Sequence, residues 1–312
     1  MIKKIIPIIL AGALLTGCSV TETETIETVH TVNIPPKMLF LGDSVPDGYG
    51  LDGYSAEDNS HCMSYPNILE DEYREELKGV TDTEMINKAV SGDTSSDLIN
   101  IIDSGEIDEY LRESDAVIVS IGGNDILRPI FEILSNLKDK DSDLFSVAAS
   151  IPNVSDKIDS ALIVFEENLN TIAEKLDSKT DGKIYVQNIY DPTEYIPVDI
   201  ITDFTKKKIN AINDIISSEA DTYTVIDIYS QFTGKSGELT NMPEFDIHPN
   251  AEGHKLIANI VDEELRKSDF TYYTYESEEH ISKFGIGLIG GSSALALIGI
   301  ISLVIALKKK KS

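Results

Sequence analysis

Short apolar runs alternate with longer, helix-like segments through the middle of the chain. The runs are four to six residues long, and most are rich in β-branched side chains, as buried strands are. The predicted strands cover residues 38–41, 85–90, 116–121, 184–189 and 224–228. The predicted helices cover residues 65–77, 96–102, 156–176, 203–218 and 251–266. This alternation predicts an α/β protein, with a five-stranded parallel sheet, helices on both faces and right-handed crossovers between strands.

A first membrane signal lies at the amino end. Lys3 and Lys4 precede an apolar stretch, residues 5–15, that is too short to span a bilayer core of about 30 Å as a helix. We therefore predict a signal peptide over residues 1–17. Its end, Leu15-Thr16-Gly17-Cys18, resembles the lipobox of bacterial lipoproteins, and this resemblance implies that Cys18 becomes the lipidated first residue. The alternative is an ordinary secretory signal with a chance cysteine at its end.

A second membrane signal lies at the carboxyl end. Residues 284–307 contain no charged side chain, and 24 residues at about 1.5 Å each can cross a bilayer as a helix. The lysine-rich tail, residues 308–312, follows directly, and the positive-inside rule places it in the cytoplasm. A buried core helix is the alternative. We therefore expect a lipid-anchored, single-pass protein of the cell membrane, with the intervening residues on the extracellular side.

The extracellular part is predicted to be one acidic domain between two spacers. Residues 18–36 are a polar linker, residues 37–268 the domain, and residues 269–283 a juxtamembrane spacer. All 54 acidic residues lie between the membrane signals with 20 of the 26 basic ones, a balance of about −34. Such a charge disfavours nucleic acid as a partner and disfavours electrostatic adhesion to lipid head groups. Cys62 is the one cysteine beyond Cys18, so we expect it to be buried and unpaired in the mature chain.

Four polar motifs carry the candidate chemistry. Gly42-Asp43-Ser44, Ser91-Gly92-Asp93, Gly122-Gly123-Asn124-Asp125 and Asp246-Ile247-His248-Pro249 occur in this order, and the first three directly follow predicted strands. Ligands bind at the carboxyl ends of strands in open α/β sheets. The motifs resemble those of the GDSL, or SGNH, hydrolase family, over about residues 37–268. The resemblance implies a flavodoxin-like three-layer α/β/α sandwich and a serine esterase or lipase-like activity without a metal or organic cofactor.

The resemblance also assigns roles to individual residues. Ser44 is the expected nucleophile, and His248 is the base that removes its proton, because a serine hydroxyl is a poor nucleophile unaided. Negative charge develops on the carbonyl oxygen during attack and requires donors aimed at it. The family pattern gives these donors as the backbone N–H groups of Ser44 and Gly92 and the side-chain amide of Asn124. Glycine at position 92 leaves the approach of substrate to its backbone unhindered.

One position departs from the family pattern. The family's acidic residue lies three positions before the histidine, but residue 245 is phenylalanine and the nearest acid, Asp246, lies two positions before His248. A shortened loop could present Asp246 to the imidazole as the third member of a triad. The alternative is a main-chain carbonyl in that place, which leaves a Ser-His dyad.

Plain structural roles compete at several positions. Gly122 and Gly123 suit a turn, Asn124 could cap a helix, and Asp43 and Asp125 are expected to brace loops. The remaining histidines, His30, His61 and His254, have no supporting motif, and His254 is expected in packing or at the surface. No cluster has the spacing of a metal site.

The substrate is suggested by one apolar segment. Residues 126–155 follow Asn124, and several of their apolar side chains share one helical face. These are Leu127, Ile130, Phe131, Ile133, Leu134 and Leu137. The face could line an acyl groove for a lipid ester, or merely cover the sheet. An O-acetyl carbohydrate is the other candidate substrate, and an O-acyltransferase or a catalytically silent carbohydrate- or lipid-binding module are the other candidate functions.

Overall fold

The computed structural model describes residues 3–7, 21–127, 130, 144–218, 220, 222–281 and 302–304. The chain divides into two compact units. One unit is Asn33–Ser268, and the other joins Met1–Val32 with Asp269–Ser312.

Five parallel strands form the centre of the unit Asn33–Ser268, which confirms the predicted α/β class. They are β3 (Lys37–Gly42), β4 (Glu84–Asn87), β5 (Ala116–Ser120), β6 (Lys183–Gln187) and β7 (Thr224–Ile226). Their order across the sheet is β4-β3-β5-β6-β7. This is the flavodoxin-like order, in which the chain winds outward in both directions from its first strand. It creates a switch point between β3 and β5, where ligands bind at the carboxyl ends of the strands.

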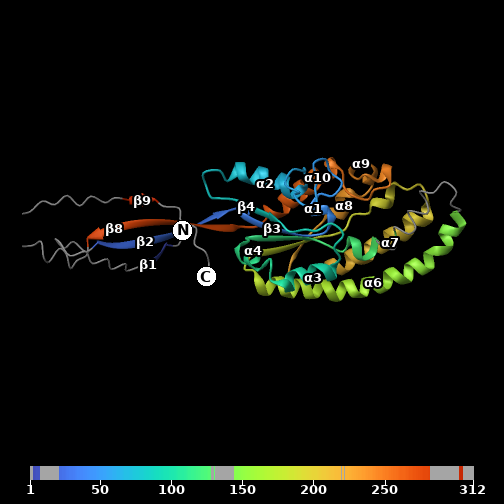
Figure 1. The fold of residues 1–312 in the computed structure, drawn as a ribbon, viewed down its shortest axis with the longest axis horizontal. Helices are drawn as coiled ribbons and strands as arrows, with labels where there is room; N and C mark the ends of the chain where they lie inside the picture. The colour runs from blue at the N-terminus through green and yellow to red at the C-terminus, as the bar shows by residue number, and fades with distance from the viewer. Residues whose placement is uncertain are drawn as a thin grey trace, which may run out of the picture. The chain divides into compact units, whose positions relative to one another are not determined.

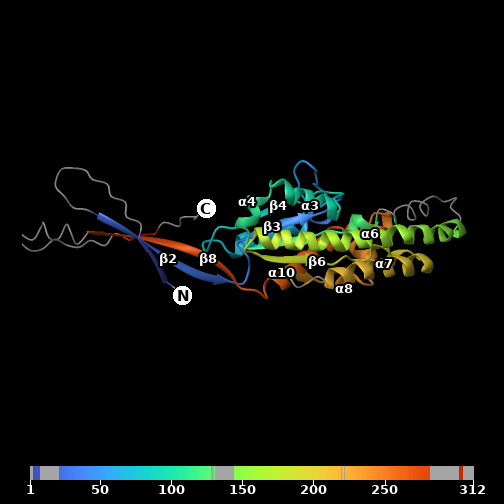
Figure 2. The same ribbon diagram turned by 90° about the horizontal axis from the view of Figure 1, so that it is seen from below.

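The central strands are apolar throughout because helices cover both faces of the sheet. All five residues of β5 are buried, as are five of the six residues of β3. On one face lie α2 (Tyr65–Glu76) and α10 (Ala251–Leu265), and on the other lie α3 (Ser95–Ser104), α6 (Leu144–Lys179) and α7 (Asp199–Ser218) (Figure 1). Figure 2 looks onto the second face, where α6 lies along the direction of strands β3 and β6.

Two helices begin well before their predicted first residues. Helix α6 has 36 residues and begins at Leu144, so it includes residues 144–155 of the apolar segment that precedes the helix predicted at 156–176. Helix α7 begins at Asp199 rather than at residue 203. Buried side chains explain the length of α6, because Val154 and Ile158 continue the apolar stripe that Phe165 forms against the core.

Short helical segments complete the unit. They are α1 (Ser44–Asp47), α4 (Asp108–Glu113), α8 (Ile228–Phe232), α9 (Ser236–Leu239), η1 (Pro192–Tyr195) and η2 (Met242–Glu244). Among them, α1 and α8 directly follow the carboxyl ends of β3 and β7, whereas α4 precedes β5. Cys62 lies in the loop between α1 and α2. It is free and buried, as expected, and its thiol donates a hydrogen bond to the carbonyl oxygen of Asn59 at 3.1 Å.

The second unit pairs the two segments that the sequence treats as linker and spacer. Strands β2 (Thr21–Val32) and β8 (Phe270–Ile281) are antiparallel over twelve residue pairs, with β1 (Lys3–Pro7) and β9 (Ser302–Val304) outside them. His30 stacks on Tyr272 across the ribbon, with ring centroids 4.8 Å apart. Neither strand could fold alone, and cross-strand pairs of aromatic and β-branched side chains stabilise them together. Pairing between distant segments is not visible in either segment's composition.

Most of the membrane signals lie outside the described residues. Cys18 lies outside the described residues. The predicted span 284–307 does too, except for Ser302–Val304, which form β9 rather than a helix. In the part of the chain that is described, no helix combines the length and the apolar character needed to cross a membrane.

Candidate active site

A sharp turn after β3 places Ser44 at the edge of the sheet. Gly42 has a φ of +140°, and a Cβ atom there would lie 1.9 Å from the carbonyl oxygen of Ser120 on β5. Only glycine fits this close approach. The same carbonyl accepts a hydrogen bond from the N–H of Asp43 at 3.1 Å, and the Asp43 carboxylate accepts one from the N–H of Val45 at 3.1 Å. Ser44 is thereby fixed as the first residue of α1.

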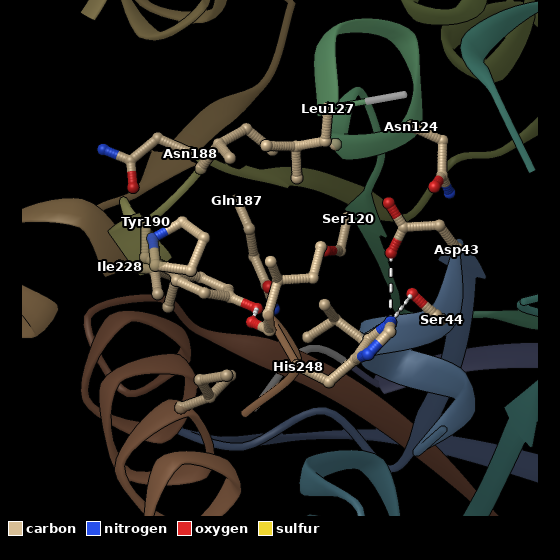
Figure 3. A pocket seen from close by; sticks show the side chains of 16 residues that line it. Asp43, Ser44, Ser120, Asn124, Leu127, Gln187, Asn188, Tyr190, Ile228 and His248 are labelled. Carbon is tan, nitrogen blue, oxygen red and sulfur yellow. Dashed lines mark hydrogen bonds between the residues drawn. The ribbon is translucent and has the colours of Figure 1, made fainter. Parts of the chain in front are cut away.

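His248 meets Ser44 from the far end of the sequence. Its Nε2 atom lies 3.0 Å from the hydroxyl of Ser44, although 204 residues separate them (Figure 3). Its Nδ1 atom lies 2.5 Å from Oδ1 of Asp246. The structure therefore brings together the three residues that the sequence suggested as nucleophile, base and orienting acid.

A tight turn resolves the short spacing between Asp246 and His248. Phe245 adopts a left-handed conformation with a φ of +60°, and the N–H of Asp246 donates to the carbonyl oxygen of Asn241 at 3.2 Å. The Asp246 carboxylate then turns forward, where Oδ1 also accepts the backbone N–H of His248 at 3.1 Å. One oxygen thus receives two hydrogen bonds from the same histidine. The partner of Nδ1 is the carboxylate, and not the main-chain carbonyl that the sequence left open.

Hydrogen bonds from the histidine keep Asp246 ionised. Partial burial favours the neutral acid, but hydrogen bonds and the charge of His248, with a smaller contribution from Asn241, outweigh it and hold the pKa of Asp246 below its usual range. The carboxylate is therefore charged at neutral pH. A charged carboxylate behind the imidazole stabilises the imidazolium that forms when the serine loses its proton.

Two of the three expected oxyanion residues, Ser44 and Asn124, line one pocket. Asn124 donates from Nδ2 to the carbonyl oxygen of Asp93 at 2.9 Å, which orients its amide instead of capping a helix. Gly92, the residue before Asp93, has a φ of +94° and open space around the position of a Cβ atom. Asn124 and Ser44 line the same side of the pocket (Figure 3).

Asp125 braces this side of the site, as the sequence suggested. Its two carboxylate oxygens accept the backbone N–H and the hydroxyl of Ser95 at 3.0 Å and 2.5 Å. Ser95 is the first residue of α3, so Asp125 ties the start of that helix to the segment that carries Asn124.

A mostly apolar pocket opens beside Ser44 and His248. The space enclosed by its lining residues, including the part that is open to solvent, is about 520 Å³. Its apolar lining residues are Val45, Leu127, Ile189, Tyr190, Pro192, Ile228, Ile247 and Ile257. Four of the eight, Ile189, Tyr190, Pro192 and Ile228, follow β6 or β7, and the sequence did not single them out as site residues. Of the predicted acyl-groove face, Leu127 lines the pocket, Ile130 is buried in the core, and the other four residues lie outside the described residues.

Two further residues of the site region escaped the sequence-based prediction. Tyr49 packs on the imidazole of His248, with ring centroids 4.7 Å apart, and Asp47 lies in the same short helix as Ser44. Asp47 is three positions beyond Ser44, so its closeness in sequence to the first motif could have marked it as a residue of the site region. The contact between Tyr49 and His248 joins distant parts of the chain and had no local signal.

The other histidines do not join the site. His254 is fully buried in α10, and its Nδ1 atom accepts the backbone N–H of Tyr65 at 3.3 Å. Burial lowers its pKa to about 3, so the ring is neutral and serves in packing. His30 lies in the β2–β8 ribbon, and His61 is an exposed neighbour of Asp58. Within the described ranges, no group of three or more His, Cys, Asp or Glu side chains could hold a metal ion.

Asp43 is a buried acid with an unusual titration. Burial raises the pKa of its carboxyl to about 7, and the charges of Asp125 and Asp93 act in the same direction. An acid with a pKa of 3.8 when unfolded and about 7 when folded binds its proton more tightly in the folded state. Its contribution to stability is therefore present at low pH and is lost as the pH rises from about 4 to about 7.

Asp43→Asn is expected to remove this dependence, because asparagine cannot ionise and its carbonyl can still accept the N–H of Val45. At about 1.4 kcal/mol per pKa unit, the mutant should gain about 3 kcal/mol relative to the wild type between pH 5 and pH 8. Denaturant unfolding of both proteins at the two pH values measures the difference. Equal changes in the two proteins would show that Asp43 ionises normally in the fold.

The doubly wound sheet and the serine, histidine and carboxylate at its edge define a hydrolase of the α/β class with a serine-centred site. The chain belongs to the GDSL-like Lipase/Acylhydrolase family, which residues 40–256 match. In Bacillus subtilis (strain 168), "Uncharacterized protein YpmR" is 24% identical over 270 residues, which cover 81% of this chain and 92% of that protein.

Solved structures share the fold at low identity. The lipase Lip_vut3 from a goat rumen metagenome is 20% identical, with a TM-score of 0.55 over 72% of this chain and 95% of that chain. Phospholipase A1 from Streptomyces albidoflavus NA297 is 18% identical, with a TM-score of 0.55 over 73% and 99% of the two chains. The W215I form of Axe2, an acetyl xylan esterase from Geobacillus stearothermophilus, is 18% identical, with a TM-score of 0.50 over 75% and 97%.

Proposed function

We propose that this hydrolase cleaves carboxylic esters through an acyl-enzyme on Ser44. The observation that carries the proposal is the hydrogen-bonded chain from Ser44 through His248 to Asp246 at the mouth of an apolar pocket. Proteins that share the fold include a lipase, a phospholipase A1 and an acetyl xylan esterase, and all three names denote the cleavage of carboxylic esters.

The reaction follows from the geometry. The Ser44 hydroxyl attacks the ester carbonyl carbon while His248 takes its proton, and the Gly92 and Asn124 donors stabilise the negative oxygen. Collapse of this intermediate breaks the bond to the alcohol, which leaves with the proton from His248. Water then attacks the acyl-enzyme with His248 again as base, so the acid is released and Ser44 is restored.

We further propose that the acyl group is hydrophobic and longer than acetyl. The pocket beside Ser44 is lined mainly by aliphatic and aromatic side chains, and burial of apolar surface there favours chains that reach it. The terminal sequence signals support placement of the domain outside the cell, tethered to the membrane, where lipid esters are available.

A series of p-nitrophenyl esters tests the proposal on the full-length protein. Each buried methylene contributes about 0.8 kcal/mol, or about fourfold, so kcat/KM for butyrate, which has two more methylenes, is expected to exceed that for acetate by about 15-fold. Ser44→Ala protein provides the background rate. A strict preference for acetate would contradict the hydrophobic acyl pocket and favour carbohydrate deacetylation, and products that require an added alcohol would instead indicate a transferase.

A further inference from the structure

The last residue of α1, Asp47, is a buried carboxylate with an unusual number of donors. The residue is 6% exposed, and its side chain accepts four hydrogen bonds. Oδ1 accepts from Nδ2 of Asn59 at 2.8 Å, and Oδ2 accepts from the hydroxyl of Tyr54 at 2.7 Å. Oδ2 also accepts both the backbone N–H of Ser91, at 3.2 Å, and the hydroxyl of Ser91. A buried charge is stable only with such compensation.

The two bonds from Ser91 anchor the residue directly before a predicted oxyanion donor. One oxygen of Asp47 accepts both the backbone N–H and the hydroxyl of Ser91, and the next backbone N–H along the chain is that of Gly92. On the other side of Gly92, the carbonyl of Asp93 accepts the amide of Asn124. Gly92 thus lies between two anchored residues, Ser91 bound to Asp47 and Asp93 bound to Asn124. Donors aimed in advance at the developing charge are the source of their catalytic effect.

The same carboxylate is also connected to His248, the proposed base, through two tyrosine side chains. The ring of Tyr54, whose hydroxyl binds Asp47, packs edge-on against Tyr49 with centroids 5.5 Å apart, and Tyr49 packs on His248. Burial and the nearby Asp47 carboxylate raise the pKa of Tyr54, so its phenol stays protonated and remains a donor.

We propose that Asp47 is a positioning residue that holds the Gly92 N–H in the oxyanion hole and braces His248 through Tyr54 and Tyr49. It lies one helical turn from Ser44, so α1 carries both the nucleophile and the anchor of the oxyanion loop. Asp47 does not line the pocket and acts through other residues. This inference rests on the proposed ester hydrolysis.

Asp47→Asn tests the inference on the full-length protein with a p-nitrophenyl ester. Asparagine has one acceptor oxygen and one NH₂ group. If the NH₂ group takes the place of Oδ2, it faces the donors of Ser91 and Tyr54, and if it takes the place of Oδ1, it faces the donor of Asn59. Because loss of one oxyanion donor costs about 10²–10³-fold in kcat, partial displacement of Gly92 is expected to lower kcat by about 10- to 100-fold, with KM within twofold. Asp52→Asn is the matched control, since it removes the same charge at an exposed carboxylate five positions along.

Binding of a boronic acid separates positioning from general loss of structure. Its tetrahedral adduct with Ser44 places an oxygen in the oxyanion hole, so its inhibition constant should rise in parallel with the fall in kcat/KM. Ser91→Ala and Tyr54→Phe each remove one donor to Asp47 and should show smaller effects of the same kind, which keeps the test available if Asp47→Asn folds poorly.

Two results would overturn the positioning role. One is a kcat within twofold of wild type in Asp47→Asn and the two donor variants, and the other is a lower kcat with unchanged boronic acid affinity. Failure of the proposed function looks different, because wild-type protein would then hydrolyse none of the esters and bind no boronic acid.

Discussion

Ser44→Ala is expected to lower kcat/KM for p-nitrophenyl butyrate by about 10⁴- to 10⁶-fold, the range typical of the removal of a serine nucleophile. The same change is expected to abolish covalent labelling by a fluorophosphonate probe. The physical reason is that the Ser44 hydroxyl lies 3.0 Å from the base His248, and an alanine leaves no oxygen to form the acyl-enzyme. Stability should change little, because one small side chain at the edge of a pocket is lost.

Ser120→Ala is the matched control for this experiment. Ser120 is also a buried serine that lines the pocket, with 6% exposure against 8% for Ser44, but the pair with His248 is made by Ser44. We therefore expect Ser120→Ala to keep the labelling and most of the activity. Labelling that persists in Ser44→Ala, or disappears in Ser120→Ala alone, would assign the nucleophile to another residue.

Asp246→Asn is expected to lower kcat by about 10²- to 10⁴-fold, as loss of the orienting carboxylate does in a serine triad. Asparagine keeps the size of the side chain but removes the charge that stabilises the imidazolium of His248. It also permits the amide to present its NH₂ group to Nδ1, which would favour the wrong tautomer of the ring. The backbone turn at Phe245 should persist, so the effect falls on kcat and not on folding.

Glu244→Gln controls for the loss of charge in the same loop. Glu244 is exposed and lies two residues before Asp246. Substitutions of exposed side chains usually change stability little, so Glu244→Gln should leave kcat within about twofold. Measurement of kcat, KM and the unfolding midpoint for both variants distinguishes orientation of His248 from disruption of the loop. Near-wild-type activity of Asp246→Asn would leave a Ser44–His248 dyad as the working site.

The fold could be predicted because its signals are local. Buried parallel strands are short, continuous apolar runs, and each of the five predicted runs overlaps a strand of the sheet. Helix bounds were less accurate. The core-facing stripe of α6 extends before residue 156 to Val154 and Ile151, past Pro152, and the sequence pattern did not join these residues to the helix predicted at 156–176.

The site could be predicted in part for the same reason. Ser44, Gly92 and Asn124 follow strands that end at one edge of the sheet, so the order of motifs and strands along the chain was enough to group them. The partner of His248 remained open because it depends on the left-handed turn at Phe245, a conformation that phenylalanine seldom adopts. Asp47 was missed because its role depends on donors from two other loops.

By itself, the sequence determined the order of the strands and helices and the acidic character of the domain, and it predicted the nucleophile, base and oxyanion residues, since each of these signals lies in neighbouring residues along the chain. Only the tertiary structure decided that Asp246 holds His248, that Asp47 holds the loop of Gly92, and that residues after β6 and β7 wall the pocket. It also decided the pairing of β2 with β8. These features are contacts between residues that the local pattern does not connect, and their geometry and burial arise only when the folded chain brings those residues together.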